Sequence, residues 1–149
     1  MLKRSLIFIA LMVAGLLFYS LWFGMNADKY DKTVLPYLHS TLPMLDSWQY
    51  PDFKPLLSAQ AQAEFETEAG QAVYRRLSGL GKYKSIGKPQ YSTDRSEFIS
   101  GQGEVNIVSY TVPVVFETGP ATIKLHLILQ DGSYLIHHFR VNSGIFGSE

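Results

Sequence analysis

An uncharged, strongly apolar stretch, residues 5–24, constrains this chain more than any other feature of its sequence. As a helix, the stretch would rise about 30 Å, which matches the hydrocarbon thickness of a lipid bilayer. Its aliphatic and aromatic side chains favour insertion by about 5 kcal/mol in total, and no charge opposes them. We therefore predict a transmembrane anchor over residues 5–24.

Two basic residues at the start of the chain orient this anchor. Because Lys3 and Arg4 are expected to stay in the cytoplasm, residues 1–4 form a cytoplasmic N-terminus and the chain after about Met25 is translocated. A cleaved signal peptide is the alternative. Its apolar core would be shorter, and a cut after Ala27 would place Met25 at position −3, where small residues are preferred. The pattern favours an uncleaved anchor.

The part of the chain that follows the anchor is long enough for one domain. About 125 of the 149 residues remain, which suffices for a hydrophobic core. Without Lys3 and Arg4, acidic residues exceed basic ones by two, which argues against a nucleic-acid-binding surface. The absence of cysteine excludes disulfides, thiol catalysis and thiolate metal sites. We expect residues 25–32, which are polar, to link the anchor to a domain over residues 33–149.

Prolines divide the first helical segment of this domain. Leucine and valine recur at helical spacing over residues 34–45. Because proline is tolerated in a first turn but not in a helix interior, we expect a helix that starts near Pro36 and restarts or kinks at Pro43. After it, Asp52 is expected to cap a short turn that runs to Leu57.

A second and longer helix is predicted over residues 58–81. Apolar residues recur there at intervals of four and form one stripe. Gly70 weakens the middle of this helix by about 1 kcal/mol relative to alanine. Gly79 and Gly81 can adopt the positive φ that ends a helix.

The rest of the sequence alternates between apolar and polar residues, which predicts strands. Pro113 cannot donate a ladder hydrogen bond and therefore marks a sheet edge or a bulge. We expect about four antiparallel strands, over residues 86–91, 105–116, 121–130 and 133–142, with a polar loop over residues 93–103.

The turn between the last two strands decides which of their faces pair. A two-residue loop, 131–132, would set the apolar face of one strand against the more polar face of the other, because a shift of one residue reverses every side chain. A three-residue loop, 130–132, with Gly132 in the left-handed conformation pairs Leu127 with Leu135. We therefore predict the three-residue loop.

These elements together predict an α+β fold in which helices cover one apolar face of a four-stranded antiparallel sheet. The order of these elements resembles that of a known group of domains, and three segments of the sequence carry the resemblance. A helix ends at a tryptophan in LPMLDSWQYPDF, another runs into a glycine pair in VYRRLSGLGKY, and strands close the chain in VPVVFETGPATIKLHLILQDGSYLIHHFRV. Over residues 42–143 the chain is similar to small cystatin-like, NTF2-like domains of bacterial membrane-anchored proteins that carry no assigned function.

This resemblance implies a helical layer wrapped by a curved sheet, held in the periplasm by an anchor in the bacterial inner membrane. Larger members of the fold group include enzymes with a polar pocket, and others dimerise through the sheet or assemble into membrane complexes. No catalytic motif of an enzymatic branch matches this chain, so the resemblance carries over no catalytic residue. Fold similarity alone licenses no activity.

A pair of histidines in the last two strands is the first candidate for chemistry. His126 and His138 fall on one sheet face and could ligate a metal ion or move protons. The neighbouring Lys124 and Arg140 would repel a cation. We therefore predict no metal site and no cofactor, and a solvated or partner-facing histidine pair.

A third histidine falls on the apolar face of the predicted sheet. A buried imidazole needs a hydrogen-bond partner, and Tyr110 on the neighbouring strand is the expected one for His137. A satisfied core histidine is the simpler interpretation. The alternative is a binding pocket formed by His137, Tyr110 and Trp48.

The outer face of the predicted sheet is the second candidate surface. An exposed apolar patch there would tend to mark a partner surface, although scattered surface hydrophobes are an equal alternative. The patch would consist of Val105, Ile107, Val115, Ile128 and Ile136.

Two functional hypotheses follow from the sequence. The first is a single-pass, membrane-anchored periplasmic binding or assembly module, not an enzyme, that acts through contacts with a protein partner or as a homodimer through the outer sheet face. The alternative is a small-ligand binder or an enzyme with a pocket between the helices and the sheet. The first is favoured because polar residues that could converge are scarce.

Overall fold

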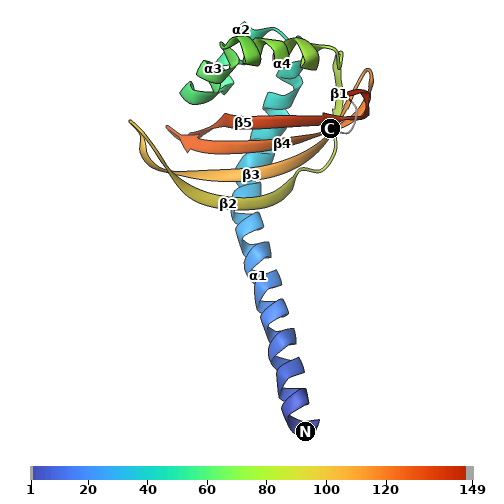
Figure 1. Cartoon of the computed structure of the whole chain (residues 1–149), viewed down its shortest axis with the longest axis vertical. Helices are drawn as coiled ribbons and strands as arrows, with labels where there is room; N and C mark the ends of the chain where they lie inside the picture. Colours follow the sequence, from blue (N-terminus) through green and yellow to red (C-terminus); the bar gives the residue numbers. More distant parts are fainter. Residues whose placement is uncertain (1, 147–149) are drawn as a thin grey trace. The chain divides into compact units, whose positions relative to one another are not determined.

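The structure, a computed structural model, describes residues 2–146 of the chain and contains an α+β arrangement (Figure 1). The chain divides into two compact units, Met1–Thr33 and Val34–Glu149. Helix α1 (Leu2–Thr41) makes up the described part of the first unit and continues into the second. The second unit contains all the other helices and all the strands.

Helix α1 is long and apolar enough to cross a membrane. It is 40 residues long, and the most apolar window near its start has a mean hydropathy of 2.4 and no buried residue. The side chains of residues 5–24 are all exposed. The predicted apolar helix is therefore confirmed, and it is compatible with anchoring in a membrane.

The helix predicted to start near Pro36 is wrong, because α1 continues through this proline. An internal proline costs about 3 kcal/mol. The side chains of Val34 and Leu38 are fully buried, which stabilises the helix by about 1.5–3 kcal/mol each and outweighs that cost. The restart predicted at Pro43 is confirmed, since a 3₁₀ helix, η1 (Leu42–Asp46), begins there.

Short helices follow in place of the single one predicted over residues 58–81. The predicted helix is divided in two, and each part begins at its own N-cap. The backbone N–H of Ala61 donates to the side chain of Ser58, and that of Gly70 donates to the side chain of Thr67. Asp52 caps no helix and accepts a hydrogen bond from the hydroxyl of Ser47 instead. The elements are α2 (Tyr50–Phe53), η2 (Lys54–Leu56), α3 (Ala59–Phe65) and α4 (Glu68–Ser78).

An open antiparallel sheet of five strands forms the rest of the second unit. The strand order is β1-β3-β4-β5, and β2 pairs with β3 on the same edge as β1. Two corrections follow: the sheet has five strands rather than four, and residues 93–103, predicted as a loop, mostly belong to β2. The strands are β1 (Tyr83–Ile86), β2 (Gln90–Ile99), β3 (Gly103–Phe116), β4 (Gly119–Gln130) and β5 (Ser133–Ser143).

Pro113 explains why two strands share one edge of β3. The pairing of β1 with β3 ends at Val114, and the pairing of β2 with β3 begins at Thr111. Pro113 lies in the gap between them, where its missing N–H costs no ladder bond, and its carbonyl accepts from the N–H of Gly87 at 2.7 Å.

The β4–β5 hairpin corrects the predicted three-residue loop. Gln130 pairs with Ser133, and both residues of the turn, Asp131 and Gly132, have positive φ, as a two-residue hairpin turn requires. A bulge then places His137 between the Leu127–Ile136 and His126–His138 pairs. This extra residue restores the pairing of apolar with apolar side chains that the three-residue loop was predicted to provide.

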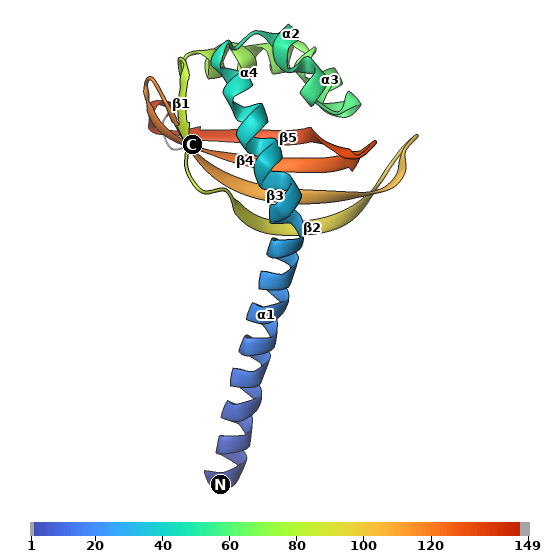
Figure 2. The same cartoon turned by 180° about the vertical axis from the view of Figure 1, so that it is seen from behind.

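One face of the sheet, here called the inner face, packs on the helices. Residues 34–41 of α1 cross β4 and β5, where the ring of Tyr37 contacts Tyr134 (Figure 2). Aromatic rings from the chain between α1 and α4 complete this core. Trp48 packs on Phe116, and Phe65 stacks on Phe139. The buried sheet residues of this face are Val108, Tyr110, Val112, Val114, Phe116, Ala121, Ile123, Leu125, Leu127, Tyr134 and Ile136.

The exposed apolar patch predicted on the outer face is wrong for three of its residues. Ile107 and Ile128 are neighbours across β3 and β4 and are almost completely buried. Ile136 is buried too, and the two-residue turn, which pairs it with Leu127, places it on the inner face. Val115 is 38% exposed and Val105 is partly buried, so no continuous apolar patch forms from this set.

Candidate functional site

The three predicted pocket residues lie in three different places. Trp48 is buried, and its Nε1–H donates to the carbonyl of Gly81 at 2.7 Å. Tyr110 is buried at the inner face with its ring edge-on to Tyr91. His137 occupies the bulge of β5. Of the three, His137 alone lines one of the cavities described below.

The hydrogen-bond partner of His137 is a serine rather than the tyrosine that was expected. Its Nδ1 lies 3.1 Å from Oγ of Ser58, the residue that caps α3. The N–H of Ser58 also donates to the carbonyl of Ile136 at 2.9 Å. Ser58 thus fixes the start of α3 against the bulge, and the expectation of a satisfied histidine holds with a different partner.

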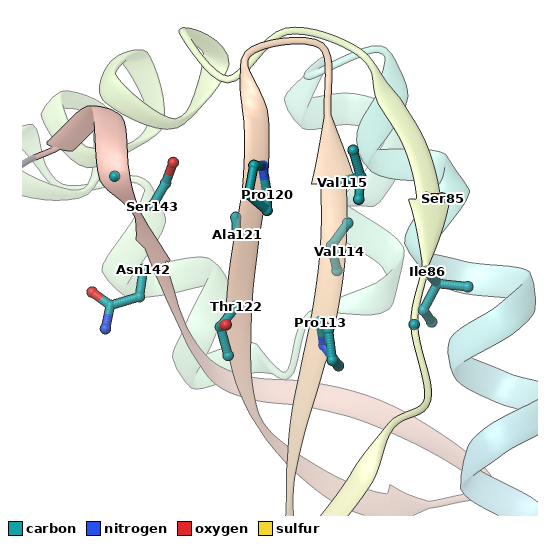
Figure 3. Close-up of a pocket in the computed structure, with 12 residues that line it drawn as sticks. Ser85, Ile86, Pro113, Val114, Val115, Pro120, Ala121, Thr122, Asn142 and Ser143 are labelled. Atoms are coloured by element: carbon teal, nitrogen blue, oxygen red, sulfur yellow. The ribbon is translucent and has the colours of Figure 1, made fainter.

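The largest cavity described, about 710 Å³, is a groove where the ends of β1, β3, β4 and β5 meet (Figure 3). We call it the proline groove because Pro113 and Pro120 line it together with Val115, Thr122 and Asn142. Glycine at position 87 allows the backbone to approach Pro113 closely, since a Cβ there would lie 3.0 Å from Cβ of Pro113. No ionisable side chain is among its described lining residues.

A second cavity, about 310 Å³, collects the three histidines of β4 and β5. We call it the histidine cavity. The rings of His126 and His138 meet edge to face with centroids 5.7 Å apart. Its lining residues are Gln60, Glu64, Arg95, Glu97, His126, His137 and His138.

The surroundings of His126 favour its neutral form. Burial lowers the pKa of this imidazole most, and the positive charges of His138, Arg95 and His137 lower it further, while Glu97 opposes them. Glu97 is itself paired with Arg95 at 3.3 Å. His126 is therefore uncharged at pH 7.

Two serine–histidine contacts border this cavity, but neither is a catalytic pair. Ser58 is 1% exposed and its hydroxyl oxygen already accepts from Ala61, so it cannot reach a substrate. Ser109, which lies 3.1 Å from Nδ1 of His126, is also buried. The two partners are 79 positions apart in the first contact and 17 positions apart in the second, so no short sequence motif indicated either contact.

The histidine cavity does not present a ready metal site. Within residues 2–146 no three histidine, aspartate or glutamate side chains are placed to hold a metal ion together. Ser58 and Ser109 each occupy one nitrogen of a histidine, and Arg95 adds a positive charge.

A third cavity, about 440 Å³, lies between α4 and β5, and we call it the arginine cavity. His138 lines both this cavity and the histidine cavity, and Asn142 lines both this cavity and the proline groove. The three cavities therefore follow one another along β5. Sequence reasoning missed the arginine cavity because its basic residues, Arg76 and Arg140, come from elements 64 positions apart.

Comparison with known proteins adds no relative to this description: no family model, curated protein or solved structure matches the chain.

Proposed function

We propose that this chain is a single-pass, membrane-anchored periplasmic module that binds or assembles with another protein and has no catalytic activity of its own. We also propose that its second unit is a cystatin-like, NTF2-like domain and that the anchor lies in a bacterial inner membrane with residues 1–4 in the cytoplasm. The apolar helix α1 and the α+β arrangement support this proposal.

The proline groove carries the proposal. General acid–base and nucleophilic catalysis need titratable or activated side chains in contact with the substrate, and none lines this groove among the described residues. Its proline, valine and threonine side chains offer apolar contacts with few hydrogen-bonding groups, which suits an uncharged, extended protein segment. A peptide of that kind is the partner that we expect.

Site-specific crosslinking tests this proposal directly, because the chain contains no cysteine of its own. A Val115→Cys variant would carry a photoreactive benzophenone in the groove, and a Ser100→Cys variant would carry it on the exposed β2–β3 turn as the matched control. We expect one adduct of defined mass from Val115→Cys in intact membranes and none from Ser100→Cys. Adding Thr122→Lys should abolish that adduct by placing a charge in the groove.

The masses of the adducts separate the possible partners. A different protein supports an assembly module, and an adduct of twice the chain mass supports a homodimer. Equal labelling from Val115→Cys and Ser100→Cys would overturn the proposal. It would also be overturned if Val115→Cys gave no adduct, or an adduct that Thr122→Lys left unchanged. Fusion of a reporter that is active only in the periplasm to the C-terminus tests the proposed orientation, and a silent reporter would contradict it.

The alternative function, a small-ligand binder with a pocket between the helices and the sheet, is favoured by one observation. The histidine cavity brings Glu64 and Gln60 of α3 together with polar side chains of three strands. Native mass spectrometry of the chain purified in mild detergent distinguishes this alternative. A bound molecule that His138→Ala releases would support it.

A further inference from the structure

We propose that the arginine cavity binds an organic anion: a carboxylate or phosphate group attached to a short apolar body. This inference goes beyond the proposed function, because it concerns a small ligand at α4 and β5 and requires no protein partner in the proline groove.

Positive charge without a counterion is the first reason. Arg76 and Arg140 both line the cavity, together with His138 and Asn142. No carboxylate is among the described lining residues. The ion pairs found in residues 2–146 use Arg95 and Lys54 instead.

The two arginines differ in what already holds them. Arg76 donates from Nη2 to the carbonyl of Phe146 at 2.9 Å, and its guanidinium lies 4.9 Å from the centre of that ring. Its place in the last turn of α4 also suits the helix dipole. Arg140 has no such structural partner among the described residues.

The position of Arg140 makes its lack of a counterion more significant. Its cross-strand neighbour on β4 is Lys124, and like charges opposite each other destabilise a sheet. The adjacent pair on the same face is His126 and His138, which supplies no negative charge. A bound anion would relieve this repulsion, and arginine can bind a carboxylate or phosphate through two parallel hydrogen bonds.

An apolar wall beside the arginines is the second reason. Inorganic phosphate would use the basic groups alone and leave this wall in water, whereas an organic anion would cover both. The volume of about 440 Å³ falls in the usual range for small-ligand sites. The wall consists of Val73, Leu77, Phe139, Val141 and Phe146.

Binding of hexyl phosphate to the full chain in nanodiscs of uncharged lipid tests the proposal. Saturation-transfer NMR with a titration would report the affinity. We expect hexyl phosphate and hexanoate to bind, inorganic phosphate to bind at least tenfold more weakly, and hexanol to show no saturable binding. Arg140→Gln should weaken hexyl phosphate binding about tenfold or more, since charge-assisted hydrogen bonds are lost.

Arg75→Gln is the matched control, because it removes the same charge from the same turn of α4 but from a residue that does not line the cavity. We expect this variant to bind hexyl phosphate as the unmodified chain does. Arg140→Lys, with circular dichroism melting of each variant, separates loss of the site from loss of the fold. Equal weakening by Arg75→Gln and Arg140→Gln, or equal binding of hexanol and hexyl phosphate, would overturn the proposal.

Two further arms identify the source of the anion. Anionic phosphatidylglycerol in the nanodisc should compete with hexyl phosphate if the natural ligand is a lipid headgroup, and should have no effect if it is a free organic anion. Glu149→Gln tests the carboxylate of the chain itself. If hexyl phosphate binds only to this variant, the cavity belongs to the chain's own acidic side chain and the proposal fails.

Discussion

The hydroxyl oxygen of Ser58 lies 3.1 Å from Nδ1 of His137, and this contact joins two segments that are 79 residues apart in the sequence. The same oxygen accepts from the N–H of Ala61 at 3.2 Å, and the N–H of Ser58 donates to Ile136. One buried serine therefore caps α3, joins the start of this helix to β5 through a backbone hydrogen bond and provides the hydrogen-bond partner of the histidine in the bulge. The junction of helix and sheet depends on this residue.

Replacement of Ser58 by alanine should destabilise the second unit by about 1–3 kcal/mol, because it removes a helix cap and leaves a half-buried imidazole nitrogen unsatisfied. Thr67→Ala is the matched control, since Thr67 caps α4 and contacts no histidine. That variant should lose about 1 kcal/mol. Urea unfolding of the full chain in detergent measures both, and equal losses would show that the bond to His137 contributes nothing.

Gly70→Ala should destabilise the chain, although alanine is the better helix former by about 1 kcal/mol. A Cβ at this position would lie 2.1 Å from the carbonyl oxygen of Glu64, so α3 and α4 would have to separate. At Gly144 nothing lies within 4 Å of such a Cβ, and Gly144→Ala should be close to neutral. Thermal melting of the two variants compares them, and a stabilised Gly70→Ala would contradict the close approach.

Stability should fall as the pH drops below about 6.5, in part because of His126. Burial and the nearby His138, Arg95 and His137 lower the pKa of His126 in the folded state, so the unfolded state takes up the proton first. The stabilising contribution is therefore complete above the ordinary pKa and is lost as the pH falls through the lower folded value. Glu97, in the same cavity, moderates the loss because its negative charge raises the pKa of His126.

Urea midpoints at pH 7.5 and 5.5 measure this dependence. His126→Gln should reduce the difference between the two midpoints, whereas His39→Gln, at an exposed position, should leave it unchanged. An unchanged difference in His126→Gln would mean that other groups account for the whole effect of pH.

Trp48→Phe should cost about 0.5–1.5 kcal/mol, because phenylalanine keeps the ring contact with Phe116 but cannot donate to the carbonyl of Gly81. The chain has 2 tryptophans, and the other, Trp22, is exposed on α1. Trp22→Phe should leave the unfolding of the second unit unchanged. Each variant also leaves a single fluorescent reporter, so fluorescence follows the two units separately.

The apolar anchor and the last three strands could be predicted from sequence because their patterns are long and regular. The alternation of β4, with Ile123, Leu125 and Leu127 on one face, follows directly from its half-buried position. Strand β2 could not be found in this way. It lies at the sheet edge with most of its side chains exposed, so its sequence is mostly polar and resembles that of a loop.

Other errors came from choices that tertiary contacts decide. Proline at position 36 favoured a helix start, but burial of its neighbours on the sheet keeps α1 continuous. The cap at Thr67 is visible in sequence as a threonine before a glutamate, yet the apolar stripe across residues 58–81 concealed the break. The candidate cavities were inaccessible to such reasoning, because their lining residues meet only after β5 has bulged and α4 has packed beside it.

The bulge at His137 lets the β4–β5 hairpin keep a two-residue turn while Phe139 and Val141 still pair with Leu125 and Ile123. Ile136 already pairs with Leu127 before the extra residue, and His138 pairs with His126 after it. Deletion of His137 would therefore leave these pairs, and the side of the sheet that each later residue faces, unchanged. It would instead straighten β5 and remove the hydrogen-bond partner of Ser58, so a shorter hairpin would keep its register and lose its tie to α3.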